Sequence, residues 1–192
     1  MSTTNKFTHR ENRFNNRALT GLGKWLALWE LNAAARLWQV HAPNSDGLVV
    51  DFGAGNGIFW DIATPPKNLL LMDISANLLE TSQTPCLKVV SDALHPPLEL
   101  GSCSGIMALG LIEYIRDLDG LFCRWRELAG DDCMLLISNS PPILPNLARQ
   151  WLGFGAKARR DDVVRNSLRN SGWELLSDTP VRVGWQSLFV AK

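Results

Sequence analysis

The stretch VVDFGAGNG, residues 49–57, joins a short apolar run that ends in an acid to three glycines within five positions. The apolar run is typical of a buried strand, and glycine both accepts positive φ and lets a ligand approach the main chain. In an open α/β sheet, ligands bind at the carboxyl ends of the strands, where the first strand turns toward its helix. The stretch therefore predicts a strand followed by a ligand-binding turn, with a ligand-free tight turn as the less favoured interpretation.

The residues around the glycines distinguish between kinds of ligand. The dinucleotide pattern G-x-G-x-x-G requires glycine at position 58, which is Ile58, and the Walker sequence G-K-[ST] does not occur here. Asp51, at the end of the expected strand, would repel a pyrophosphate but suits a cationic amino group. We therefore expect the ligand to present an amine to this turn.

Short apolar runs recur along the chain and alternate with helical or loop segments. They resemble strands buried on both faces of a parallel sheet, and they lie at 48–52, 68–73, 86–92, 104–110 and 133–139. Helical spacing is found after Asp73, from Asp117 to an expected C-cap at Gly130, and over 161–170. Two closely joined terminal strands, 173–178 and 183–192, should pair antiparallel. The alternation predicts a doubly wound α/β domain.

Two more acids end the second and third expected strands. Asp73 closes the run LLLMD and Asp92 closes the run VVSD. An acid at the second position can accept hydrogen bonds from both hydroxyls of a ribose. Asp92 is placed to meet an adenine amino group, so the three strand ends together favour a nucleoside joined to an amine.

This ordered set of segments resembles the class I S-adenosylmethionine-dependent methyltransferases, from about Leu48 to Asn139 and more loosely to Lys192. VVDFGAGNG resembles the glycine-rich motif I of that family, and LLLMDIS and SDAL resemble its two following acidic loops. The resemblance implies a seven-stranded, mostly parallel sheet with an antiparallel C-terminal strand. It also implies S-adenosyl-L-methionine as cofactor and methyl transfer to an oxygen or nitrogen of a small metabolite, as in biosynthesis. The helix after motif I should be short, since Pro65-Pro66 follows soon after it.

The resemblance implies cofactor-binding roles for particular residues. The main chain of the glycine turn would contact the methionine part, with Asp51 near its ammonium, and Asp73 would bind the ribose. Arg17 or Arg13 would neutralise the methionine carboxylate. The full implied set is Asp51, Phe52, Gly53, Ala54, Gly55, Gly57, Asp73, Ile74, Asp92, Ala93, Leu109, Gly110 and Arg17.

Candidates for a catalytic base are few. Glu113 and Tyr114 follow the fourth expected strand, where they would lie near the transferred methyl group. Tyr114 alternatively packs against the helix from Asp117, and His9, in the polar N-terminal arm, is either a base or a solvated side chain. A base is needed only where the accepting atom must lose a proton.

Length and composition limit the remaining possibilities. The 192 residues suit one domain, with an N-terminal arm and helix (1–45) covering the substrate side and a core over 46–192. The 19 basic and 19 acidic residues balance, which disfavours nucleic acid as a partner. No apolar segment resembles a signal peptide or membrane span, so a cytoplasmic protein is expected. Four widely spaced cysteines indicate reduced, packed thiols without a metal, and the oligomeric state stays open.

The acceptor is expected to be flat or apolar. An amphipathic helix over 18–40 places Trp25 and Trp29 at helical spacing, which favours core packing but also suits a binding surface. The basic segment 149–160 is either a solvated face or a contact for an acidic substrate, a carrier protein or a membrane. Residues 139–142 are interpreted as a turn. Two other functions stay open: a non-catalytic, cofactor-binding partner subunit and, less favoured, a nicotinamide-dependent oxidoreductase.

Overall fold

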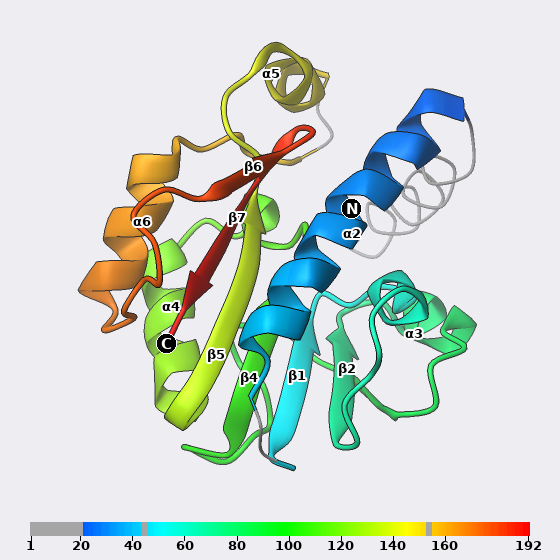
Figure 1. Cartoon of the computed structure of the whole chain (residues 1–192), viewed down its shortest axis with the longest axis vertical. Helices are drawn as coiled ribbons and strands as arrows, with labels where there is room; N and C mark the ends of the chain where they lie inside the picture. The colour runs from blue at the N-terminus through cyan, green and yellow to red at the C-terminus, as the bar shows by residue number, and fades with distance from the viewer. Residues whose placement is uncertain (1–20, 44–45, 153–154) are drawn as a thin grey trace, which may run out of the picture.

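One seven-stranded sheet organises the part of the chain that the structure, a computed structural model, describes: residues 21–43, 46–152 and 155–192. The strand order is β3-β2-β1-β4-β5-β7-β6 (Figure 1). Strands β1 to β5 run parallel, and β7 pairs antiparallel with both of its neighbours. The predicted fold class is therefore confirmed. The strands are β1 Leu48–Phe52, β2 Leu69–Asp73, β3 Leu87–Val90, β4 Cys103–Ala108, β5 Ala129–Asn139, β6 Val181–Val183 and β7 Gln186–Ala191.

Helices cover both faces of this sheet. Helix α2 lies across one face and helices α4 and α6 lie on the other (Figure 1). Among the described helices, none combines the length and the apolar character that a membrane crossing requires. The helical elements are α2 Gly21–His41, η1 Ile58–Asp61, α3 Ala76–Thr81, η2 Ile112–Tyr114, α4 Leu118–Leu128, α5 Leu144–Trp151 and α6 Asp161–Asn170.

Alternate residues of β1 build the two layers of the core. Phe52 is buried on the α4 side, where its ring stacks on Trp125 with the centroids 5.0 Å apart. Val49 packs on the other side, in the cluster that contains Trp38 of α2. This alternation points Asp51, the next residue on the α2 side of β1, into the layer beneath α2.

Helix α2 buries a different stripe from the one predicted. Ala34 and Ala35 allow close approach to the sheet, and Gly105 leaves room for Trp38, whose ring would lie 3.2 Å from a Cβ at that position. Trp25 and Trp29 are instead 62% and 50% exposed and stack on each other. The helix was predicted correctly, but the prediction that these two tryptophans pack in the core was wrong because the small residues face the sheet.

Other sequence predictions fail at edges and ends. Strand β3 is mostly exposed because it forms the edge of the sheet, so burial on both faces was a wrong expectation for 86–92. Helix α4 ends at Leu128 and β5 begins directly at Ala129, so Gly130 is a strand residue and not a C-cap. The segment 173–178 makes one bridge, Leu175 to Ala191, while β6 takes the hairpin position. Cys123 is exposed, unlike the packed thiol expected there.

Candidate active site

The glycine turn after β1 is held against the end of β2. The amides of Gly53 and Ala54 both donate to the carbonyl of Met72, at 2.8 and 3.1 Å. Gly53, Gly55 and Gly57 all have positive φ, from 57° to 73°. After the turn the chain makes only the short 3₁₀ helix η1, as expected from Pro65-Pro66. The turn thus presents main-chain groups at the carboxyl end of the sheet without a long following helix.

The glycines of the site differ in what surrounds them. In the part of the chain that the structure describes, a Cβ built on Gly55 would meet only Leu78, at 3.9 Å, and one on Gly110, also at positive φ, would meet nothing within 4 Å. A Cβ on Gly57 would lie 2.7 Å from the Ser82 hydroxyl. Gly55 and Gly110 therefore border open space into which a ligand could reach the main chain, whereas Gly57 is required by packing inside the protein.

A matched pair of alanine variants separates packing from backbone conformation. Gly57 and the exposed Gly101 have φ of 73° and 69°, but no described residue lies within 4 Å of a Cβ on Gly101. Gly101→Ala should lower the free energy of unfolding by about 1–2 kcal/mol, the usual cost of a left-handed conformation. Gly57→Ala should lower the free energy of unfolding by about 1–3 kcal/mol more than Gly101→Ala does, because the new methyl group is overpacked against its neighbours. Urea denaturation of both variants measures the difference, and equal losses of stability would contradict the assignment.

Asp73 connects the glycine turn to the end of β2. Its Oδ2 accepts a hydrogen bond from the Gly55 amide at 2.8 Å, and its Oδ1 accepts one from the Ser75 amide at 2.9 Å. The side chain is half-buried. A carboxylate oxygen has two lone-pair directions, and a carboxylate fixed by main-chain amides is a suitable acceptor for the hydroxyls of a ligand.

Asp51 lies below the turn and is 4% exposed. Its Oδ2 accepts a hydrogen bond from the indole Nε1 of Trp60 at 2.8 Å. Burial raises the pKa of this carboxyl from 3.8 to about 7, the Trp60 hydrogen bond opposes the rise, and the charge of Asp73 adds to it. A cation bound above the turn would favour the ionised form of Asp51.

The raised pKa of Asp51 predicts a pH dependence of stability. The folded chain keeps a proton that the unfolded chain releases, so the free energy of unfolding should fall from about pH 4 to about pH 7 and this contribution should then level off. Asp51→Asn keeps an acceptor for Trp60 but cannot ionise. The melting temperature of the variant, compared with that of the wild type, should therefore rise as the pH increases across this range. A difference that does not change with pH would contradict the prediction.

The other predicted cofactor residues lie around the same end of the sheet. Ile74 is exposed beside Asp73, and Asp92 is exposed and accepts from the Leu94 amide at 3.0 Å. Ala93 is buried, and its carbonyl accepts from the Trp125 indole. The Phe52 side chain is in the core, so it offers a ligand only its main chain. Leu109 is half-buried, and the amide of Gly110 donates to the Ser138 hydroxyl at 2.7 Å.

A buried polar cluster lies beyond β4 and β5. Glu113 is 2% exposed, and its Oε1 accepts from the Ser140 hydroxyl at 2.6 Å, which in turn accepts from Nε2 of Gln186 at 3.0 Å. Oε2 of Glu113 and Oε1 of Gln186 are buried, and neither has a hydrogen-bond partner among the described residues. Leaving such acceptors unpaired costs about 1–3 kcal/mol each. The cluster is therefore suited to receive a hydrogen-bond donor.

Arg159 supports the segment that carries Glu113. Its guanidinium is buried and donates to the carbonyls of Ile112, at 2.6 Å, and Ile115. Burial lowers the pKa of Arg159, and the charge of Glu113 partly offsets this. The expectation of a solvated basic face over 149–160 is thus wrong for Arg159, which holds η2 in place.

The remaining catalytic candidates are Tyr114 and His9. Tyr114 is 40% exposed, at the end of η2. His9, Arg13 and Arg17 lie outside the described residues, so their predicted roles stay predictions. Sequence reasoning gave no site role to Trp60, Ser140 or Gln186. It interpreted Ser140 only as part of a turn at 139–142, and no local motif indicates Gln186, which a distant hairpin supplies.

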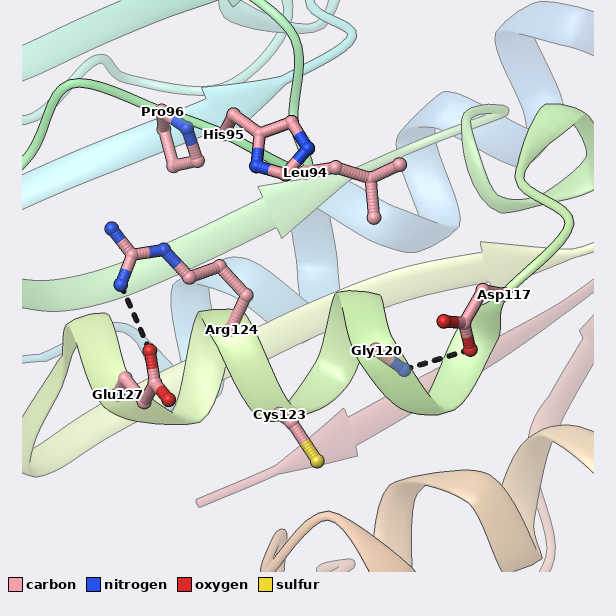
Figure 2. A pocket seen from close by; sticks show the side chains of 8 residues that line it. All are labelled: Leu94, His95, Pro96, Asp117, Gly120, Cys123, Arg124 and Glu127. Carbon is pink, nitrogen blue, oxygen red and sulfur yellow. Dashed lines mark hydrogen bonds and ion pairs between the residues drawn. The ribbon is translucent and has the colours of Figure 1, made fainter.

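A separate surface groove lies between the loop after β3 and the outer side of α4. His95 and Pro96 border it on one side and Cys123 and Arg124 on the other (Figure 2). Arg124 pairs with Glu127 at 2.8 Å, and Asp117 caps the helix through the Gly120 amide. None of the predicted cofactor or catalytic residues that the structure describes lines this groove.

Comparison with solved structures defines the class of fold. No family model matches the chain, and no curated protein matches it in sequence. Its fold is that of the class I S-adenosylmethionine-dependent methyltransferases. One similar structure, a methyltransferase of Thermotoga maritima, has a TM-score of 0.72 at 15% identity, and the match covers 96% of this chain and 98% of the Thermotoga chain. Magnesium protoporphyrin IX methyltransferase of Synechocystis, with bound S-adenosylhomocysteine, gives 0.71 at 16% identity over 94% and 92%. A methyltransferase of Archaeoglobus fulgidus gives 0.69 at 15% over 84% and 92%.

Proposed function

We propose that the protein is an S-adenosylmethionine-dependent methyltransferase that methylates an oxygen or nitrogen of a small molecule. A shared fold does not by itself imply a shared activity, so the proposal rests on the site. The observation that carries it is the carboxylate of Asp73, held by two main-chain amides beside glycines that border open space. The similar Synechocystis enzyme was solved with S-adenosylhomocysteine, which supports the same cofactor class here.

Each part of the site has a role in this proposal. Asp73 would accept hydrogen bonds from both ribose hydroxyls, and the exposed Ile74 and Asp92 would meet the adenine. The open main chain at Gly55 and Gly110 would admit the methionine part, with Asp51 below its ammonium group. The cofactor supplies a methyl group activated by the positive charge on its sulfur. The protein then contributes mainly by holding the accepting atom in line, an effect worth several kcal/mol.

Glu113 is the proposed base. Its buried carboxylate has one oxygen oriented by Ser140 and one that no described residue satisfies, and a neutral amine or hydroxyl would satisfy that second oxygen. Removing a proton from the accepting atom during transfer would leave that atom uncharged after methylation. A base of this kind suits an acceptor that carries a proton on the reacting oxygen or nitrogen, and it supports catalysis over a purely regulatory, cofactor-binding role.

The proposal is tested by supplying the isolated chain with S-adenosylmethionine labelled at the methyl group and a metabolite extract. Label should appear in small molecules, and mass spectrometry should then identify the acceptor. Cofactor binding without any labelled product across extracts, proteins and nucleic acids would support the non-catalytic alternative. Label in protein or nucleic acid alone would contradict the small-molecule acceptor while leaving the reaction class intact.

A further inference from the structure

Helix α5 buries the polar side chain of Asn146 and leaves its leucines and its tryptophan exposed. Asn146 is 3% exposed, and its Nδ2 donates to the carbonyls of Pro141 and Trp185, both at 2.8 Å. Leu144 and Trp151 are 84% and 89% exposed. A helix that covers a protein core ordinarily has the reverse arrangement. The outward stripe of α5 therefore needs an explanation other than the packing of this chain.

The exposed stripe is continuous along the helix and extends beyond it. Leu144, Leu147 and Trp151 occur at spacings of three and four, and Leu152 follows directly; all four are exposed. Trp185, in the turn between β6 and β7, is partly exposed and bonded to α5 through Asn146. Figure 1 shows α5 projecting at the end of the molecule where β7 begins, beside this hairpin. Exposed apolar patches of this kind mark interaction sites.

The charges of the segment favour one kind of partner. Residues 143–160 contain Arg149, Lys157, Arg159 and Arg160 and no acidic residue. Lys157 is exposed, Arg160 is exposed and paired with Asp162, and Arg159 is buried. Tryptophan and leucine on one surface with neighbouring cations are the features by which an interfacial helix binds an anionic bilayer.

Two other possible partners for the exposed face of α5 fit these charges less well. A two-fold dimer through α5 would place the same basic segment against itself. Residues 1–20 contain Lys6, Arg10, Arg13 and Arg17 against Glu11 alone, so they too would bring positive charge to a positive segment. An anionic lipid surface complements both the apolar stripe and the cations.

We propose that the outward face of α5, with Trp185 beside it, docks the protein peripherally on an anionic lipid surface. The inference goes beyond the proposed methyl transfer and does not depend on it, because the face lies outside the cofactor site. Trp151 and the leucines enter the headgroup region, and Lys157 contacts the anionic headgroups. Binding is reversible, since one short helix buries little apolar area.

Vesicle sedimentation tests this docking. The purified full chain is mixed with phosphatidylcholine vesicles with and without phosphatidylglycerol, at low and high salt. We expect binding to the anionic vesicles that weakens with salt. The double variant Leu144→Ser/Trp151→Ser should bind at least about tenfold more weakly, because it removes the two most exposed apolar side chains of α5. Lys157→Glu should lose most of the preference for phosphatidylglycerol.

The control is Leu87→Ser/Leu100→Ser, which removes two exposed leucines, Leu87 on the edge strand β3 (72% exposed) and Leu100 in the loop before β4 (66% exposed). It should bind like the wild type, and circular dichroism should show all variants folded. Absence of wild-type binding, equal binding by the α5 double variant, or equal binding to both kinds of vesicle would overturn the proposal. So would a dimer, seen by light scattering without lipid, that the double variant abolishes, since that identifies the face as a self-association surface.

Discussion

Asp73→Ala is expected to weaken the binding of S-adenosylhomocysteine by at least about a hundredfold. A hydrogen bond to a charged group contributes about 1.5–3 kcal/mol, and the variant removes two such bonds to the ribose, which together correspond to about two to four powers of ten in affinity. The change also frees the Gly55 and Ser75 amides, which Asp73 now holds at 2.8 and 2.9 Å. Isothermal titration calorimetry of the variant and the wild type measures the effect.

Asp46→Ala is the matched control for this variant. Asp46 precedes β1, at the other end of the strand, and forms only an exposed ion pair with Lys67 at 3.6 Å besides its main-chain bond to Asn68. Surface pairs of this kind contribute about 0–1 kcal/mol to stability, so its loss should leave cofactor affinity unchanged. Asp73→Asn, which keeps one acceptor oxygen, should fall between the two. Wild-type affinity in Asp73→Ala would rule out the ribose-binding role.

Glu113→Gln is expected to reduce methyl transfer by about a hundredfold to ten-thousandfold, the usual contribution of a general base. Glutamine keeps the size of the side chain and an acceptor for the Ser140 hydroxyl, but it cannot take a proton. Turnover would be measured as label transferred to the acceptor found in the extract screen, while calorimetry should show unchanged binding of S-adenosylhomocysteine. This prediction assumes the proposed methyl transfer.

A further variant separates chemistry from structure at Glu113. Ser140→Ala removes the hydroxyl that orients Oε1 and should reduce turnover less than Glu113→Gln does. Full turnover by a folded Glu113→Gln would show that Glu113 serves packing, and would return attention to Tyr114.

Much of the fold follows from local patterns in the sequence. The apolar runs at 48–52 and 68–73 match β1 and β2 within one residue, and the helical spacing over 161–170 matches α6. The two strands are buried between layers and α6 buries one of its faces, so their hydrophobic pattern reports their environment directly. Strand β3 and segment 173–178 carry the same apolar pattern but lie at an edge, where pairing and burial depend on neighbours that the local sequence does not reveal.

Part of the candidate site could likewise be predicted from the sequence, and part could not. Asp51, Gly55 and Asp73 belong to adjacent strand ends, and parallel topology alone brings them together. The Glu113 cluster joins η2, the end of β5 and the start of β7, and Ser140 and Gln186 have no motif that connects them. The arrangement of α5 was equally hidden, because periodicity locates an apolar stripe on a helix but does not say whether that stripe faces the protein or the solvent.

Titration calorimetry of the wild-type chain with S-adenosylhomocysteine tests the central claim most directly, with NAD as the comparison ligand. The proposed function predicts saturable binding of one S-adenosylhomocysteine per chain, a rise in melting temperature with ligand concentration, and no binding of NAD. No heat of binding and no thermal shift at about 1 mM S-adenosylhomocysteine would contradict the proposed function.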